Sequence, residues 1–291
     1  MTYCVAIRLD AGIVFLADSR TNAGVDQIST FRKMTVFENP GERVLVLLTA
    51  GNLAVTQAVT QILSERIGPE HVSVWTATTM VEATRIIGDA VREVYHRDAA
   101  ALGEFGIDFN AKFIFGGQIR GECMRLFHVY SAGNFIEATE ENLYFQIGEA
   151  KYGKPIIDRV MQPSTGLDEA AKCALISMDS TLKSNISVGL PLDLLVYEAD
   201  TLHVTKFVHI DGSNQYMNMI RNTWGARLKQ VFAEIPDPTW LDSYVPAGAP
   251  RLQTDASQPV RARPPTRLQP EPAAESTSPV QLVAGQQQTA R

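Results

Sequence analysis

The order in which strand and helix patterns follow one another is the feature of this sequence that most constrains its fold. Two apolar runs, Tyr3–Leu9 and Gly12–Ser19, meet at a turn around Asp10-Ala11-Gly12 and predict a β-hairpin. Further strands are predicted at Phe31–Phe37, Arg43–Ala50, Ala111–Ile119, Met124–Tyr130, Leu192–Asp200 and Thr201–His209. Apolar residues at helical spacing predict helices at Asn52–Ile67, Thr79–Leu102, Lys151–Met161, Leu167–Lys183 and Ser213–Glu234. Strands in hairpins and helices in pairs predict an α+β fold, with two antiparallel sheets between helix layers.

The composition changes sharply near Ser243. Residues 244–291 hold eight of the fifteen prolines and no Trp or Phe. Such a segment buries too little apolar surface to offset the entropy lost on ordering. We therefore predict one domain over residues 1–243, which includes the helix near 213–234, and a disordered Pro/Gln-rich tail over 244–291.

Composition also excludes several classes of protein. Three scattered cysteines predict neither a disulfide framework nor a zinc site, and the five histidines lack ligand spacing, so we expect no metal or cofactor. The net charge of −6 argues against nucleic acid as a partner. No apolar run reaches the roughly 18 residues that a membrane span needs, and no secretory signal precedes the first strand. We expect a cytoplasmic protein.

The second residue suggests a chemistry. Removal of Met1 would leave Thr2 with a free α-amine beside its own hydroxyl. This amine has a reference pKa of about 7.7–8.0, so part of it is neutral at pH 7 and available as a base. A threonine hydroxyl paired with its own amine is a known activated nucleophile. Taken alone, the pattern is weak, because most chains that begin Met-Thr make no use of it.

Two further features strengthen this hypothesis. Asp18 ends the second strand, and Lys33 follows fifteen residues later. A solvated strand end is the simpler interpretation of Asp18, but a buried Asp–Lys pair would keep a cation near the Thr2 amine and lower the amine's pKa. Gly51 lies at a strand-to-helix turn, where unpaired backbone N–H groups suit a developing oxyanion.

These features together resemble the proteasome β-subunit superfamily of N-terminal nucleophile hydrolases, over most of residues 2–210. The resemblance rests on the Thr2 start, the turn at 17–24, Arg32-Lys33, Ala50-Gly51 and Phe115-Gly116-Gly117. Within that superfamily the chain is most similar to Anbu, the bacterial proteasome homologue. The stretches that carry this closer similarity are Thr2–Val5, Asp18–Asp26, Ser29–Met34, Ile147–Glu149 and Lys151–Pro155.

The resemblance implies a four-layer αββα sandwich, the Ntn-hydrolase fold, and assigns roles to individual residues. Thr2 would be the nucleophile, Asp18 and Lys33 its charge partners, and the Gly51 N–H the oxyanion donor. Asp179 would orient the amine. The substrate-binding residues would be Thr21, Asn22 and Leu53.

The sequence departs from the proteasome pattern at two places near the expected site. Glu149 stands where proteasomes carry a glycine-flanked serine, and Leu182 stands where a second serine is expected. Ser180 or Ser184 would have to replace that second serine. Weak peptidase activity is therefore an expected outcome.

We expect a self-assembling threonine peptidase that forms a homo-oligomer, as a ring or an open spiral, and cleaves peptide amides; an ATPase partner stays an open question. One alternative is an amidase of the same fold that acts on a small or cross-linked metabolite. Another is a catalytically silent scaffold whose role is to assemble.

Overall fold

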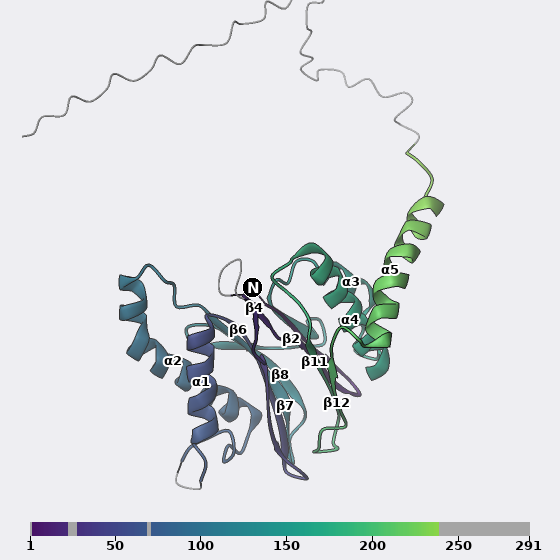
Figure 1. The fold of residues 1–291 in the computed structure, drawn as a ribbon. Helices are drawn as coiled ribbons and strands as arrows, with labels where there is room; N and C mark the ends of the chain where they lie inside the picture. Colours follow the sequence, from purple (N-terminus) through teal and green to yellow (C-terminus); the bar gives the residue numbers. More distant parts are fainter. Residues whose placement is uncertain (1, 23–27, 69–70, 239–291) are drawn as a thin grey trace, which may run out of the picture. The chain divides into compact units, whose positions relative to one another are not determined.

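Two five-stranded antiparallel sheets lie at the centre of the fold (Figure 1). The computed structural model describes residues 2–22, 28–68 and 71–238. The first sheet has the order β10-β1-β2-β11-β12. Its strands are β1 (Tyr3–Leu9), β2 (Gly12–Asp18), β10 (Tyr144–Gly148), β11 (Leu192–Glu198) and β12 (Lys206–Ile210). The second sheet has the order β5-β6-β7-β8-β9. Its strands are β5 (Met34–Asn39), β6 (Arg43–Gly51), β7 (Ala111–Ile119), β8 (Arg125–Val129) and β9 (Phe135–Glu137).

Helices cover the outer face of each sheet (Figure 1). The second sheet packs against α1 (Leu53–Glu65) and α2 (Met80–Glu104). The first sheet packs against α3 (Lys154–Val160), α4 (Leu167–Ser184) and α5 (Gln215–Glu234). A short separate ribbon pairs β3 (Arg20–Asn22) with β4 (Ile28–Thr30). The predicted four-layer αββα sandwich is thereby confirmed. None of the helices in the described ranges is long and apolar enough to cross a bilayer.

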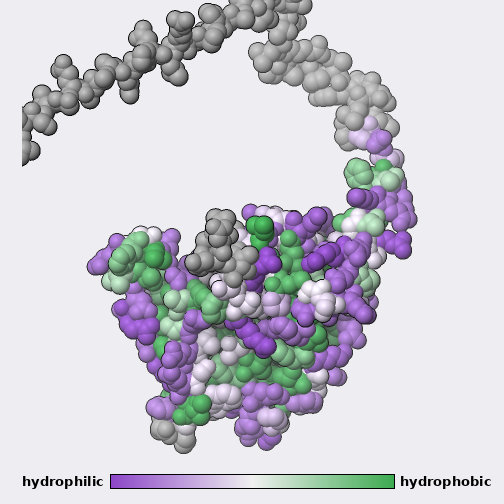
Figure 2. Space-filling view, viewed as in Figure 1, coloured by the Kyte–Doolittle hydropathy of each residue, from purple (hydrophilic) through white to green (hydrophobic). Residues whose placement is uncertain are grey.

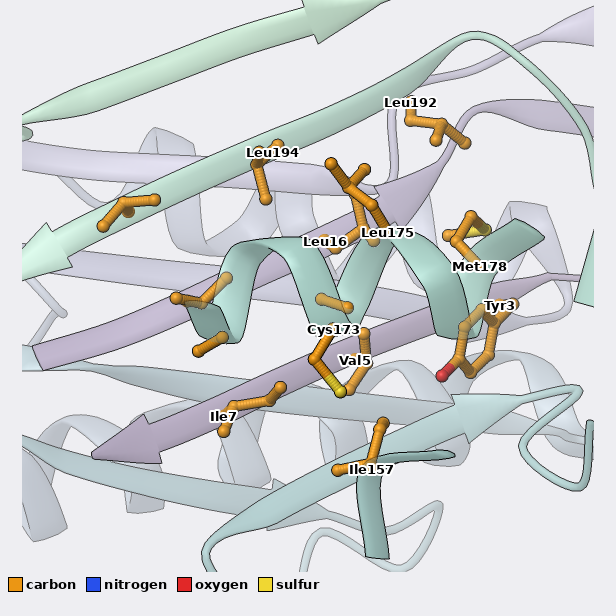
Figure 3. Packing of buried hydrophobic residues seen from close by; sticks show 14 of the residues in the cluster. Tyr3, Val5, Ile7, Leu16, Ile157, Cys173, Leu175, Met178, Leu192 and Leu194 are labelled. Carbon is orange, nitrogen blue, oxygen red and sulfur yellow. The ribbon is translucent and has the colours of Figure 1, made fainter. Parts of the chain in front are cut away.

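Alternation along β1 shows how the layers are held together. Val5 and Ile7 point toward the helices of the first sheet, where they pack near Cys173 of α4 (Figure 3). Cys4 and Ala6 point the other way and join the core between the two sheets. Because side chains of a strand alternate between its faces, a strand buried on both faces must be apolar throughout. β1 therefore connects the outer and central cores.

Several element boundaries differ from the predictions. The strand predicted at Phe31–Phe37 begins only at Met34, because Lys33 turns inward to reach Asp18. The strand predicted from Thr201 begins at Lys206, because positive φ angles at Asp200 (65°) and Leu202 (49°) break the extended backbone. Four short strands of the described residues, β3, β4, β9 and β10, were not predicted. Asn52, the first residue of the predicted helix, is the N-cap of α1, since its side chain accepts from the N–H groups of Ala54 and Val55. The predicted tail at 244–291 lies outside the described residues.

Candidate active site

The backbone of Thr2 is fixed by the end of β10. The Thr2 carbonyl accepts a hydrogen bond of 2.7 Å from the N–H of Glu149. Gly148 has a φ of +82°, and a Cβ at this position would lie 1.8 Å from the Thr2 carbonyl oxygen. Only glycine permits both this backbone conformation and this close approach. Thr2 directly precedes β1, and 9% of the residue is exposed.

Asp18 and Lys33 form a buried ion pair behind Thr2. The Lys33 Nζ donates to Asp18 Oδ1 at 2.8 Å and to the carbonyl of Arg20 at 2.6 Å. The same carboxylate accepts from the backbone N–H of Tyr3 at 3.0 Å and from that of Gly189 at 3.4 Å. Asp18 is fully buried and Lys33 is 5% exposed. The pair therefore connects β2, the start of β1 and the segment before β11.

Burial raises the pKa of the Asp18 carboxyl, while the Lys33 ammonium and the two backbone N–H groups act in the opposite direction. An ammonium carries three N–H donors, and two of those on Lys33 are used by Asp18 and Arg20. One donor is thus left for a group in the adjoining pocket, which Lys33 lines.

A pocket of about 440 Å³ opens at Thr2, and we call it the Thr2 pocket. It brings together six of the residues predicted from the sequence, namely Thr2, Thr21, Lys33, Gly51, Leu53 and Glu149. Asn22, predicted to bind substrate, is the last residue of β3, and its side chain is outside the described part of the structure.

Gly51 joins β6 to α1 at the wall of this pocket. Its φ is +118°, and a Cβ here would lie 2.2 Å from the carbonyl oxygen of Asn110. The following residue, Asn52, caps α1, and Leu53 and Thr56 of the first helical turn line the pocket. The sequence therefore needs glycine at this junction for conformational reasons, whatever its chemical role.

Asp179, Ser180 and Ser184 lie elsewhere. They line a cavity of about 930 Å³ between α4 and α5, together with Arg221. The Asp179 Oδ1 is 3.5 Å from the Arg221 Nε. None of the three is among the described residues that line the Thr2 pocket. In that cavity Asp179 faces Arg221 of α5. The expected role of Asp179 in orienting the amine stays a prediction.

The Thr2 pocket also contains residues that the sequence analysis missed. Thr49 and Thr56 lie on β6 and α1, while Asn110 and Lys112 flank Ala111, which pairs with Gly51 across β6 and β7. The sequence holds no signal for this pairing, because it joins strands separated by two helices. The ammonium of Lys112 and the carboxylate of Glu149 add two charges of opposite sign to the pocket.

A scan of protein-family models gave no match, and a search of curated proteins gave none either. Solved structures, however, match closely. Anbu (ancestral beta-subunit) from Yersinia bercovieri is 52% identical, with a TM-score of 0.77, and the alignment covers 81% of this chain and 99% of that one. Anbu from Hyphomicrobium sp. strain MC1 is 49% identical, with a TM-score of 0.75 and coverage of 81% and 98%.

A third structure shows an assembled form. The helical assembly of the Anbu complex from Pseudomonas aeruginosa is 45% identical, with a TM-score of 0.78, and the alignment covers 81% of this chain and 98% of that one. Identity of this size, over almost the whole length of three relatives with the same fold, shows common descent rather than a shared architecture alone. The chain belongs to the Anbu family.

Proposed function

We propose that this protein is a self-assembling, threonine-type amide hydrolase, in which Thr2 becomes the nucleophile once Met1 is removed. The observation that carries this proposal is the position of Thr2 at the wall of a pocket, with the buried Asp18–Lys33 pair behind it. A buried ion pair costs desolvation energy and adds little to stability. Its place beside a hydroxyl and an α-amine supports a chemical role for the pair.

The first half of the reaction forms an acyl-enzyme. The Thr2 Oγ attacks the substrate's amide carbonyl carbon, and the Thr2 α-amine takes the hydroxyl proton, directly or through one water. The Gly51 N–H donates to the oxyanion that develops on the carbonyl oxygen. The C–N bond then breaks, and the protonated amine returns its proton to the leaving nitrogen. The acyl group is left as an ester on Thr2.

The second half releases the product acid. The neutral α-amine takes a proton from water, which attacks the ester carbonyl carbon, and the Gly51 N–H again stabilises the oxyanion. The C–O bond to Thr2 breaks, and its oxygen recovers the proton. The same base therefore serves both halves, so no metal or organic cofactor takes part in any step.

Lys33 tunes this base in the proposed mechanism. Its ammonium favours the neutral form of the nearby α-amine and so lowers the amine's pKa from the reference value of about 7.7–8.0. The Asp18 carboxylate holds the ammonium in place at 2.8 Å. An extended peptide would enter along the backbone near Thr21 and Gly51, where it would add a strand beside β3.

The proposal includes assembly into a homo-oligomer in the cytoplasm. Along α5, apolar side chains of Leu228, Val231 and Phe232 are exposed beside hydrophilic ones, as Figure 2 shows for this helix. Exposed apolar stripes of this kind mark interaction sites. The relative from Pseudomonas aeruginosa forms a helical assembly. We propose an open helical arrangement for this chain too, without an assigned ATPase partner.

Replacement of Thr2 tests the chemistry. A Thr2→Ala variant should assemble normally and lose turnover of short peptide amides, whereas Thr2→Ser should retain part of it, because serine keeps the hydroxyl. Turnover by Thr2→Ala at the wild-type rate would exclude this mechanism. Cleavage of a small amide by a protein that leaves every peptide intact would favour the metabolite amidase, and inertness toward all amides would favour the scaffold.

A further inference from the structure

A further cavity, of about 380 Å³, adjoins the Thr2 pocket along the first turns of α1. We call it the α1 cleft, and it is lined by Arg32, Thr35, Thr49, Leu53, Thr56, Gln57, Thr60, Gln61 and Ser64. Thr49, Leu53 and Thr56 line both cavities. A substrate with its scissile carbonyl at Thr2 therefore has, next to that carbonyl, a separate space for one side chain.

The side chains that line the α1 cleft are mostly polar. Among the described residues that line it, Leu53 is the single apolar one. The hydroxyls of Thr56 and Thr60 donate to the helix backbone, to the carbonyl of Asn52 at 3.1 Å and to that of Thr56 at 2.9 Å. The wall therefore presents carbon atoms as well as polar atoms. This mixture suits a side chain with an apolar stem and a polar head.

Arg32 is the charged residue of the α1 cleft, and no Asp or Glu lines the cleft in the described part of the chain. Within the described residues, the Arg32 guanidinium has neither an ion-pair nor a hydrogen-bond partner. By contrast, Arg66 and Arg125 each lie 2.5 Å from a glutamate. A guanidinium offers five N–H donors in a planar fork that matches a carboxylate with two parallel hydrogen bonds. Gln57, exposed on the same wall, adds amide donors.

The charges around both cavities favour the same ligand. Among the described residues at the two cavities, Asp18 neutralises Lys33 and Glu149 offsets the charge of Lys112, which leaves the positive charge of Arg32 in excess. The chain as a whole carries a net charge of −6. A local positive excess on an acidic protein attracts anionic groups to this place and not to the rest of the surface.

We propose that Arg32 determines specificity by binding a carboxylate side chain, aspartate or glutamate, on the substrate residue that supplies the scissile carbonyl. This inference rests on the proposed function, because it places that carbonyl at Thr2. Arg32 touches the side chain and not the reacting atoms. Since the guanidinium is exposed, solvent screens part of the interaction, and we expect about a fivefold preference for a glutamate over a glutamine substrate.

The test uses electrophilic peptides that are identical except for Glu, Gln, Leu or Lys at the residue that carries the electrophile. Intact-mass spectrometry follows the rate at which each one labels the full-length, Met1-free assembly. Wild type should react about fivefold faster with the Glu peptide than with its near-isosteric Gln counterpart. Arg32→Gln should remove that preference, Arg32→Glu should shift it to the Lys peptide, and Arg32→Lys should retain part of it.

Arg85→Gln serves as the matched control, because Arg85 is an exposed arginine on α2, away from both cavities. It should keep the wild-type preference, and higher salt should weaken that preference in both proteins. Equal labelling by the Glu and Gln peptides in wild type, or a preference that survives in Arg32→Gln, overturns the assignment of Arg32 while the proposed chemistry stands. If none of the four peptides labels Thr2, the proposed function fails and the inference fails with it.

Discussion

The Lys33 ammonium lies 2.8 Å from the Asp18 carboxylate, and both side chains are buried. The same Asp18 oxygen accepts the backbone N–H of Tyr3 at 3.0 Å, so the residue that follows Thr2 is attached to the ion pair. A displacement of either partner therefore moves the start of β1. The ion pair thus links the stability of the fold to the position of Thr2.

Asp18→Asn should destabilise the protein, because it leaves the Lys33 ammonium buried without its anion. Loss of one partner of a buried pair costs about 3–5 kcal/mol. The double variant Asp18→Leu/Lys33→Met should recover much of the free energy of unfolding, measured in urea, and yet show no turnover. If Asp18→Asn unfolds at the wild-type urea concentration, the pair does not have the structural role described.

Gly51→Ala should be destabilising by about 1–3 kcal/mol, because a side chain at a φ of +118° is strained and its Cβ would meet the Asn110 carbonyl at 2.2 Å. Gly103→Ala is the matched control, since no atom lies within 4 Å of a Cβ built there, within α2. Alanine at that helical position should stabilise by about 0.5–1 kcal/mol. Thermal unfolding compares the two, and equal midpoints would contradict the described junction.

The order of elements made most of the fold predictable, since a continuous apolar run such as that of β1 is visible in the local sequence. The start of β5 was not predictable, because Lys33 leaves the extended path for a partner fifteen residues away. β10 was missed because a short edge strand is defined by its pairing with β1, and the sequence does not show that pairing.

The candidate site, too, was predictable where it depends on local sequence and was not where it depends on long-range packing. Thr2 and Gly51 lie at the ends of predictable elements, whereas Lys33 was placed with them through the motif that resembles the proteasome β-subunit superfamily. The contact of Asp179 with Arg221 was not predictable, because it depends on how α5 packs against α4. Lys112 was missed for a similar reason, since its place in the pocket follows from the pairing of β7 with β6.

Thiol reagents should modify Cys123 alone in the native protein, because Cys123 is exposed while Cys4 and Cys173 are buried. Burial raises the pKa of the Cys173 thiol to about 11 and raises that of Cys4 further, so neither forms a reactive thiolate at neutral pH. Peptide mapping after alkylation identifies the modified residue. Since Cys4 is near Thr2, turnover that stops on alkylation would point to a thiol nucleophile and contradict our account.

Acid should destabilise the protein through His128. Burial, aided by Lys112, lowers the pKa of His128 from 6.5 to about 4. Between these values the unfolded chain binds the proton and the folded protein does not, so the free energy of unfolding falls as the pH drops. Urea titrations at several pH values should show a shallower decline for His128→Gln than for wild type. Identical slopes would show that His128 titrates normally in the folded protein.

The central claim is that Thr2 carries both the nucleophile and its base, and intact-mass spectrometry with an electrophilic peptide inhibitor tests it directly. The account predicts mature chains that lack Met1 and gain one inhibitor each, with the adduct mapped to Thr2 and absent from Thr2→Ala. Mature chains that uniformly retain Met1, or Met1-free chains in which Thr2 stays unlabelled, would contradict it.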